Sequence, residues 1–180
     1  GSAALDAELV YVADLGHMVP SYATSIEGTT GIIFSPDGLK VLSVWERGGW
    51  NTPGGAVDEG EMKTQGLARE CREEVGVKLD ETRDPVYLGG YQSSRARDNR
   101  INDNFSAFAM HAVSEEFQVD QKEIQEARWL PWKELLDAWI SQGRPAGRNV
   151  PVTADFLTEE RKLVSQNMLN YLETYRSSKG

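Results

Sequence analysis

The chain has 180 residues, of which 39% are hydrophobic and 26% charged, which is enough for one globular domain with a full core. Its formal net charge of −9 argues against a nucleic-acid scaffold, because binding a phosphate backbone needs a broad basic surface. We therefore expect no extended nucleic acid as a partner. No apolar run approaches the roughly 18 residues of a membrane span, so we expect no membrane partner.

The number of cysteines indicates whether the protein resides in a reducing or an oxidising compartment. The single cysteine excludes an intrachain disulfide and fits a reducing environment. Because no signal peptide is visible either, we expect a cytoplasmic location. A targeting segment trimmed from the sequence would leave the same pattern.

Strand-forming residues dominate the first part of the chain. We expect a first strand at Glu8–Asp14 and then a hairpin with arms at Thr29–Phe34 and Leu39–Trp45. Pro36 and Gly38 suit the turn between the arms.

A glycine-rich segment leads into an acidic helix. Gly54 and Gly55 allow backbone angles that are closed to other residues and let a carbonyl approach a metal closely. In a helix from about Met62 to Val75, one patch carries the three carboxylates Glu70, Glu73 and Glu74. A separate stripe suits a core, and its members are Thr64, Leu67, Ala68, Cys71 and Val75.

Three carboxylates on one patch repel each other and destabilise an isolated helix. A hard divalent cation, Mg²⁺ or Mn²⁺, removes that penalty because it prefers oxygen ligands. The alternative is a solvated acidic face without a ligand.

Two further strands are predicted at Val86–Tyr91 and Asn104–Val113. Between them lies the only basic cluster of the chain, Arg95, Arg97 and Arg100. The cluster is either a solvated hairpin tip or a loop that binds phosphate or adenylate, since arginine pairs bidentately with phosphate.

The last third of the chain predicts a short strand at Ala127–Leu130 and a helix at Trp132–Gln142. We then expect a connection at Gly143–Val152 and one long helix from Thr153 to Arg176. The apolar positions expected to be buried in that last helix are Leu157, Leu163, Met168, Leu169 and Leu172.

The glycine-rich segment and the acidic helix together match a family pattern. Gly55, five residues, Glu61, seven residues and then RECREEVGV at 69–77 resemble the Nudix box of the Nudix hydrolases. Cys71 stands where the family usually has an aliphatic residue, and free cysteine behaves as a small hydrophobe.

The resemblance implies an α/β (α+β) sandwich, in which a mixed sheet lies between helices and the box forms a loop–helix–loop catalytic motif. Within one domain we expect an N-terminal strand and connection at 1–28, the Nudix core at 29–142 and a helical extension at 143–180.

The same resemblance implies roles for the box residues. The Gly55 carbonyl, Glu70, Glu73 and Glu74 would bind Mg²⁺ or Mn²⁺, with one glutamate as a possible base. Arg69 would orient a box carboxylate. A loop residue, Glu123, would add a further catalytic carboxylate, and its competitors are Glu126, Glu115 and Glu116.

The implied reaction is hydrolysis of the diphosphate linkage in a small nucleoside diphosphate derivative. The segments Val19–Thr24, Glu27–Gly31, Val57–Glu61 and Glu123–Pro131 resemble a plant and animal subgroup that includes ADP-ribose and NADH pyrophosphatases. We therefore expect ADP-ribose or NADH as the substrate, giving AMP.

Other substrates stay open. The segment Trp50–Gly55 resembles MutT-like enzymes, which act on (8-oxo-)dNTPs. Diadenosine polyphosphates, capped RNA and diphosphoinositol phosphates are further alternatives, and a nucleotide-binding module without turnover is the alternative outside enzymes.

Aromatic residues are candidates for stacking on a base. Trp50 and Tyr91, with Trp45 and Phe105, either stack on a nucleotide ring or pack in the core. The C-terminal helix and the N-terminal strand could form the surface of a homodimer.

Overall fold

The computed structural model describes residues 24–94, 101–120, 122 and 124–179, and the side chains at 24, 93, 94 and 101 are not part of the description. The predicted strand Glu8–Asp14 lies outside these residues. The strands are β1 (Thr24–Phe34), β2 (Lys40–Glu46), β3 (Gly49–Asn51), β4 (Gly54–Ala56), β5 (Val86–Ser94), β6 (Ile101–His111), β7 (Glu126–Pro131), β8 (Asn149–Pro151) and β9 (Leu163–Ser165). The helices are α2 (Lys63–Val75), α3 (Trp132–Ser141), the short 3₁₀ helix η1 (Glu159–Arg161) and α4 (Gln166–Ser178).

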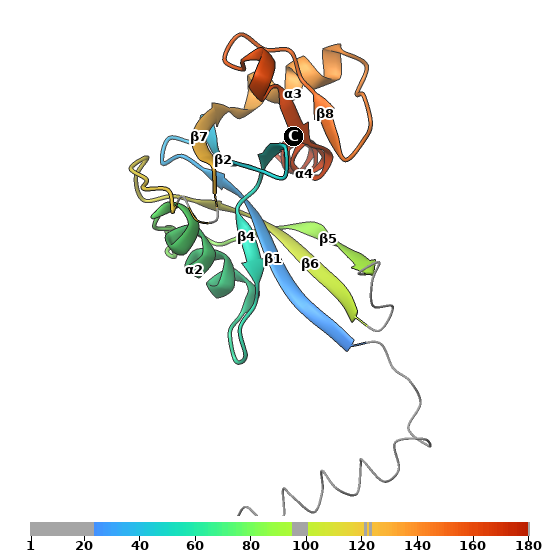
Figure 1. The fold of residues 1–180 in the computed structure, drawn as a ribbon. Coiled ribbons are helices and arrows are strands. Elements are labelled where there is room, and N and C mark those ends of the chain that lie inside the picture. The colour runs from blue at the N-terminus through green and yellow to red at the C-terminus, as the bar shows by residue number, and fades with distance from the viewer. Residues whose placement is uncertain (1–23, 95–100, 121, 123, 180) are drawn as a thin grey trace, which may run out of the picture.

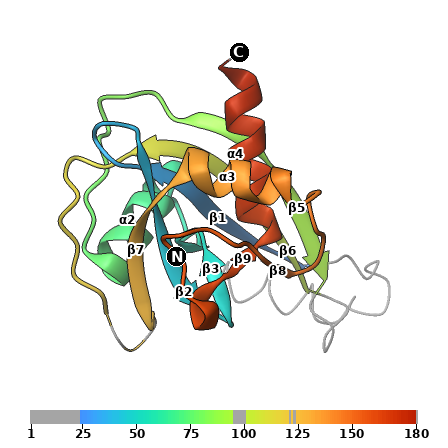
Figure 2. The same ribbon diagram turned by 90° about the horizontal axis from the view of Figure 1, so that it is seen from above.

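Within the described ranges, nine strands form one mixed sheet in the order β5-β6-β1-β2-β3-β9-β8, with β4 added to β1 and β7 added to β2. The β1–β6 and β3–β9 pairs are parallel and the remaining pairs are antiparallel. Figure 1 shows α2 on one side of the sheet and α3 and α4 on the other. From above, α3 and α4 lie close together, with β8 and β9 beside them (Figure 2). The predicted mixed sheet between helices is confirmed.

Alternation along the central strands divides the core in two. Neighbouring side chains of a strand point to opposite faces, so Ile32 packs with the residues of α3 and α4 while Ile33 packs with those of α2. Both side chains are fully buried. The long β1 is therefore covered on both faces and forms a rigid base for the segments attached to it.

Several predicted elements are confirmed. The hairpin turns between β1 and β2, where Phe34 pairs with Val41. The acidic helix, the two strands that follow it, the strand before Pro131 and the helix from Trp132 are all present. None of the helices in the described ranges is long and apolar enough to cross a membrane.

The prediction of one long helix from Thr153 to Arg176 is wrong. Residues 149–165 form β8, η1 and β9, and only Gln166–Ser178 is helical. Val150 and Val164 pair with each other across β8 and β9, and Val164 also pairs with Trp50 of β3. This sheet pairing buries both valines and outweighs the local helical pattern.

Burial in this segment follows the corrected elements. Met168, Leu169 and Leu172 of α4 are fully buried, as expected. Leu157 is only partly buried, and Leu163, at the start of β9, is exposed. The division of the chain at residues 28 and 142 stays a prediction.

Candidate active site

The box forms the predicted loop–helix–loop. At the start of α2, the backbone N–H of Met62 donates to Gln65 Oε1 at 2.9 Å. At its end Gly76 has φ 67°, a left-handed conformation that glycine adopts without strain, and its N–H donates to the Arg72 carbonyl at 3.0 Å. Because Leu67 and Cys71 are fully buried, the opposite face of α2 is presented to the site.

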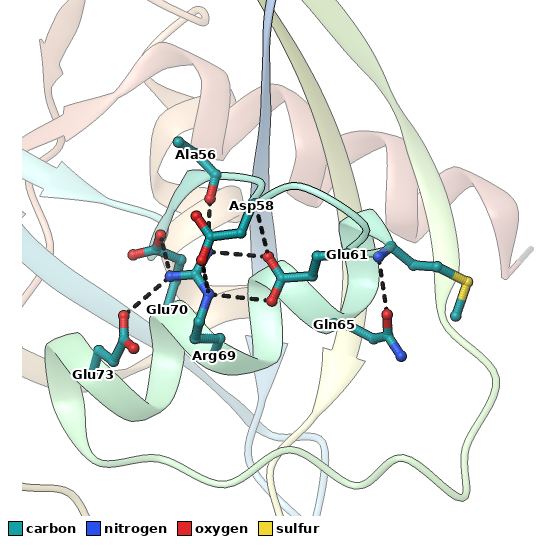
Figure 3. A network of polar contacts seen from close by, with 8 residues as sticks. Ala56, Asp58, Glu61, Gln65, Arg69, Glu70 and Glu73 are labelled. Atoms are coloured by element: carbon teal, nitrogen blue, oxygen red, sulfur yellow. Dashed lines mark hydrogen bonds and ion pairs between the residues drawn. The ribbon is translucent and has the colours of Figure 1, made fainter. Parts of the chain in front are cut away.

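Arg69 binds several carboxylates at once (Figure 3). Its Nη1 donates to Glu70 Oε1 at 2.9 Å and to Glu73 Oε2 at 3.1 Å. Its Nε and Nη2 donate to the two oxygens of Glu61 at 3.2 and 3.1 Å, and Nη2 also donates to the Ala56 carbonyl at 2.8 Å. One guanidinium therefore ties the helix to the loop that precedes it.

The electrostatics follow from this geometry. Hydrogen bonds from Arg69, together with the backbone N–H of Asp58, hold the pKa of Glu61 below its usual value. The same carboxylates, Glu61 foremost, raise the pKa of Arg69. The guanidinium is thus a fixed positive charge beside Glu61.

Two glycines bring β4 against both β1 and α2. A Cβ on Gly54 would lie 2.2 Å from the Thr29 carbonyl oxygen, and Gly54 has φ 149°, which L-residues rarely adopt. A Cβ on Gly55 would lie 2.4 Å from Glu70 Oε1. The N–H of Gly54 donates to Glu74 Oε2 at 3.4 Å. The Glu70 and Glu74 carboxylates therefore lie directly against this glycine pair, as the box pattern implies.

The donor set has the chemistry of a hard-cation site. Glu70, Glu73 and Glu74 supply only oxygen ligands, and Mg²⁺ and Mn²⁺ prefer oxygen. Glu74 is 9% exposed, whereas the Glu73 side chain is 58% exposed and turns toward Arg69. Among the described residues, no three acidic, histidine or cysteine side chains are gathered as a ready ligand cluster. The residues fit a divalent cation if Glu73 turns away from Arg69.

A cavity of about 570 Å³ lies beside the glycine pair. Gly54, Gly55 and Ala56 line it together with Tyr91 and Phe105. The two rings are stacked with their centroids 5.4 Å apart and an interplanar angle of 7°. A ligand in this cavity can therefore contact the box and an aromatic surface together.

The residues predicted to stack on a nucleotide ring lie in different environments in the structure. Tyr91 is 40% exposed and lines the cavity, and its role in substrate binding stays a prediction. The prediction that Trp50 binds substrate is contradicted, because Trp50 is 0% exposed. Its ring meets Trp45 edge to face, and its Nε1 donates to the Arg161 carbonyl at 2.8 Å. Trp50 and Trp45 are core residues.

Four predicted residues lie outside the described part of the chain, namely Arg95, Arg97, Arg100 and Glu123. Asp120, a described neighbour in the chain, is attached to α2, because its N–H donates to the Glu74 carbonyl at 2.9 Å. Ile124 is buried in the cluster that includes Leu67 of α2.

Two competitors of Glu123 are held elsewhere. Glu126 pairs with Arg128 and Arg161, and Glu115 pairs with Lys40 at 2.7 Å. Glu116 is exposed.

The structure adds residues that the sequence did not single out. Arg47, Arg148, Asn167 and Tyr171 line the cavity, and the last two come from the segment predicted as one long helix. Burial, followed by the neighbouring Tyr91, raises the pKa of Tyr171 to about 12, so its hydroxyl stays protonated at neutral pH. Only Arg47 had a local signal, since it stands in a glycine-rich turn; nothing in the sequence places the others at a site.

The fold and the site together define an α+β protein with a carboxylate-rich loop–helix–loop at the edge of a cavity. The NUDIX domain family matches residues 26–150, and the chain belongs to this family. Members of the family generally use a divalent metal ion.

Curated relatives from Arabidopsis thaliana include Nudix hydrolase 7, which is 28% identical over 134 residues that cover 71% of this chain and 46% of that protein. Nudix hydrolase 2 is 33% identical over 105 residues, which cover 54% of this chain and 36% of that protein. The chain thus spans less than half the length of these two relatives.

Solved structures share the fold. The MutT protein from Methanosarcina mazei Go1 aligns with a TM-score of 0.54 and 18% identity over 88% of this chain and 98% of that chain. A MutT NUDIX hydrolase from Burkholderia pseudomallei aligns with a TM-score of 0.50 and 23% identity over 61% of this chain and 85% of that chain. At these identities the likeness is one of fold alone.

Proposed function

We propose that the protein hydrolyses the diphosphate linkage of a nucleoside diphosphate derivative, with ADP-ribose or NADH as substrate and AMP as a product. The observation that carries the proposal is the Arg69 network, which holds box carboxylates against Gly55 at the edge of the cavity. The stacked Tyr91 and Phe105 offer a surface for an adenine or nicotinamide ring.

The residues suggest a division of labour. The Gly55 carbonyl and the carboxylates of Glu70, Glu73 and Glu74 would hold Mg²⁺, or Mn²⁺ in its place, which neutralises charge on the diphosphate. Water attacks one phosphorus, the anhydride P–O bond breaks, and the leaving phosphate takes the electron pair. Glu70, Glu73 or Glu123 accepts the water proton, and Arg69 keeps the box carboxylates oriented.

The test is a hydrolysis panel with Mg²⁺ or Mn²⁺ that contains ADP-ribose, NADH, an 8-oxo-dNTP, a diadenosine polyphosphate, capped RNA and a diphosphoinositol phosphate. We expect AMP from ADP-ribose or NADH. The exchanges Glu73→Gln and Glu74→Gln should each reduce turnover strongly, while Glu81→Gln, in an exposed loop, is the matched control. Full turnover by both box variants would refute metal-assisted hydrolysis at the box.

A second candidate is hydrolysis of a nucleoside triphosphate. Asn51, from the segment that resembles MutT-like enzymes, lines the cavity, and its Nδ2 is held by the carbonyls of Glu46 and Gly49. Release of pyrophosphate from a triphosphate, without AMP from the diphosphate substrates, would favour this candidate. Ligand binding without any turnover would favour a sensing module.

Two other expectations stay predictions. Sedimentation at micromolar concentration tests the homodimer against a single species of 20.0 kDa. Fractionation of cells from the source organism tests the cytoplasmic location.

A further inference from the structure

A second cavity, of about 290 Å³, adjoins the first where the β2–β3 turn meets the start of α4. Its described lining includes Arg47 and Arg148 and contains no aspartate or glutamate. This is unusual in a chain with a formal net charge of −9. The larger cavity, in contrast, has Glu46 and Asp103 in its wall, which offset the same two arginines. The smaller cavity is therefore the cationic end of the site.

The two cavities share part of their lining. Tyr91 and Asn51 line both, as do Arg47, Arg148 and Ser165. A single ligand can therefore contact the glycine pair of the box in one cavity and the arginines in the other.

The start of α4 opens on the smaller cavity. Ser165 immediately precedes this 13-residue helix, and Ser165, Gln166 and Asn167 all line the cavity. The N-terminus of a helix carries a partial positive charge and unpaired N–H groups, which favour anions. Ser165 is only 8% exposed, its side chain does not cap the helix, and its hydroxyl has no hydrogen-bond partner among the described residues. Because Ser165 lines the cavity, this hydroxyl can donate a hydrogen bond to a ligand there.

The two arginines are held close to this helix end by their backbones. The N–H of Gln166 donates to the Arg148 carbonyl at 3.1 Å, and Asn149 Nδ2 donates to the Arg47 carbonyl at 3.3 Å. The lack of a side chain on Gly49 permits this contact, because a Cβ there would lie 2.8 Å from the Asn149 amide. Asn149 thus couples the β2–β3 turn to β8.

The side chains of the arginines remain available. Arg148 is exposed and forms no ion pair with any described residue. The Arg47 side chain is 73% exposed, and its one ion pair with a described residue is a long 3.5 Å contact to Glu46. Its φ of 50° is left-handed, which is uncommon for a residue other than glycine and is a feature that concentrates at ligand sites.

We propose that the smaller cavity is an anion subsite that binds a phosphate monoester of the substrate, apart from the diphosphate at the box. The proposal rests on the proposed function and narrows it to nucleoside diphosphate derivatives that carry an extra phosphate on a ribose. Guanidinium groups and helix N–H groups donate charge-assisted hydrogen bonds to such a dianion, with Ser165 as a further donor.

The test is calorimetric titration of the full chain in EDTA with AMP, adenosine 2′,5′-bisphosphate and adenosine 3′,5′-bisphosphate. Without turnover, this compares ligands that differ by one phosphate. We expect at least one bisphosphate to bind about tenfold more tightly than AMP or better. The 2′ and 3′ compounds show which ribose position reaches the subsite.

Variants assign the preference to the subsite. Arg148→Ala should reduce it about tenfold, and so should Arg47→Gly, which removes the guanidinium while glycine tolerates the φ of 50°. The control Arg83→Ala removes an exposed arginine that pairs with Asp80 outside both cavities and should keep the preference.

Equal binding of the three nucleotides, or no measurable binding of any, overturns the subsite. A preference for a bisphosphate over AMP that survives both Arg148→Ala and Arg47→Gly also overturns the subsite. If the preference holds but no diphosphate is hydrolysed, the proposed reaction is wrong and the subsite stands. If ADP-ribose is hydrolysed but no preference exists, only the subsite is wrong.

Discussion

Replacing Gly55 with alanine should impair catalysis far more than folding. The added Cβ would lie 2.4 Å from Glu70 Oε1, whereas ordinary contacts begin at 3.4 Å. The carboxylate must therefore move by about 1 Å, and a misplacement of that size costs on the order of a hundredfold in rate. This corresponds to about 2.7 kcal/mol of transition-state stabilisation.

The cost to folding should be small, because the Cβ meets the far end of a flexible side chain. The displaced Glu70 loses its 2.9 Å bond to Arg69, and partly exposed ion pairs of this kind contribute up to about 1 kcal/mol. For a chain of this size that is a shift of about 2–4 °C in Tm.

The assay combines initial rates of ADP-ribose hydrolysis, Mn²⁺ affinity by electron paramagnetic resonance and thermal unfolding. The control is Gly38→Ala in the β1–β2 turn, where φ is 74° and no atom lies within 4 Å of the added Cβ. It should lower stability by about 1 kcal/mol and leave the rate unchanged. A folded Gly55→Ala protein with wild-type rate and Mn²⁺ affinity would refute the reasoning.

Three further predictions concern substitutions of Arg69, Tyr91 and Trp50. Arg69→Gln should lower the free energy of unfolding by about 2 kcal/mol at pH 7 in urea titrations. Arg69 lowers the pKa of Glu61 in the folded state, so the hydrogen bonds between them stabilise the fold fully above pH 4.5, the ordinary pKa of the glutamate. The loss of unfolding free energy in the variant should therefore shrink as the pH falls below 4.5. A loss that stays constant with pH would contradict this assignment. Tyr91→Ala should raise KM about tenfold by removing the exposed ring of the stacked pair, while Tyr91→Phe changes KM little; equal KM values in steady-state assays would count against a stacking role. Trp50→Ala should destabilise the protein by about 3–5 kcal/mol, whereas Trp50→Phe, which keeps most of the buried ring, should retain its KM; a raised KM in the phenylalanine variant would return Trp50 to the site.

The sequence predicted the local elements well where one pattern was long and consistent. The acidic helix was found because its apolar stripe and its glycine at position 76 agree with each other, and the structure places it at Lys63–Val75. The region after Pro151 was wrongly predicted as helix, because its apolar residues are too few for their spacing to distinguish a helix from strands. There the parallel pairing of Val164 with Trp50, 114 positions apart in the chain, decides the conformation.

What the sequence alone determined is the box: the glycine pair, Arg69 and the glutamates lie within one loop–helix–loop, so their spacing nearly specifies their geometry. What only the tertiary structure decided is the rest of the cavity. Tyr91, Arg47 and Arg148 come from three separate segments, and Trp50 is withdrawn into the core although it adjoins Asn51 in the cavity wall. Successive residues of a strand face opposite sides, and residues remote in the chain meet only through the sheet, so no local pattern can indicate which of them reach the ligand.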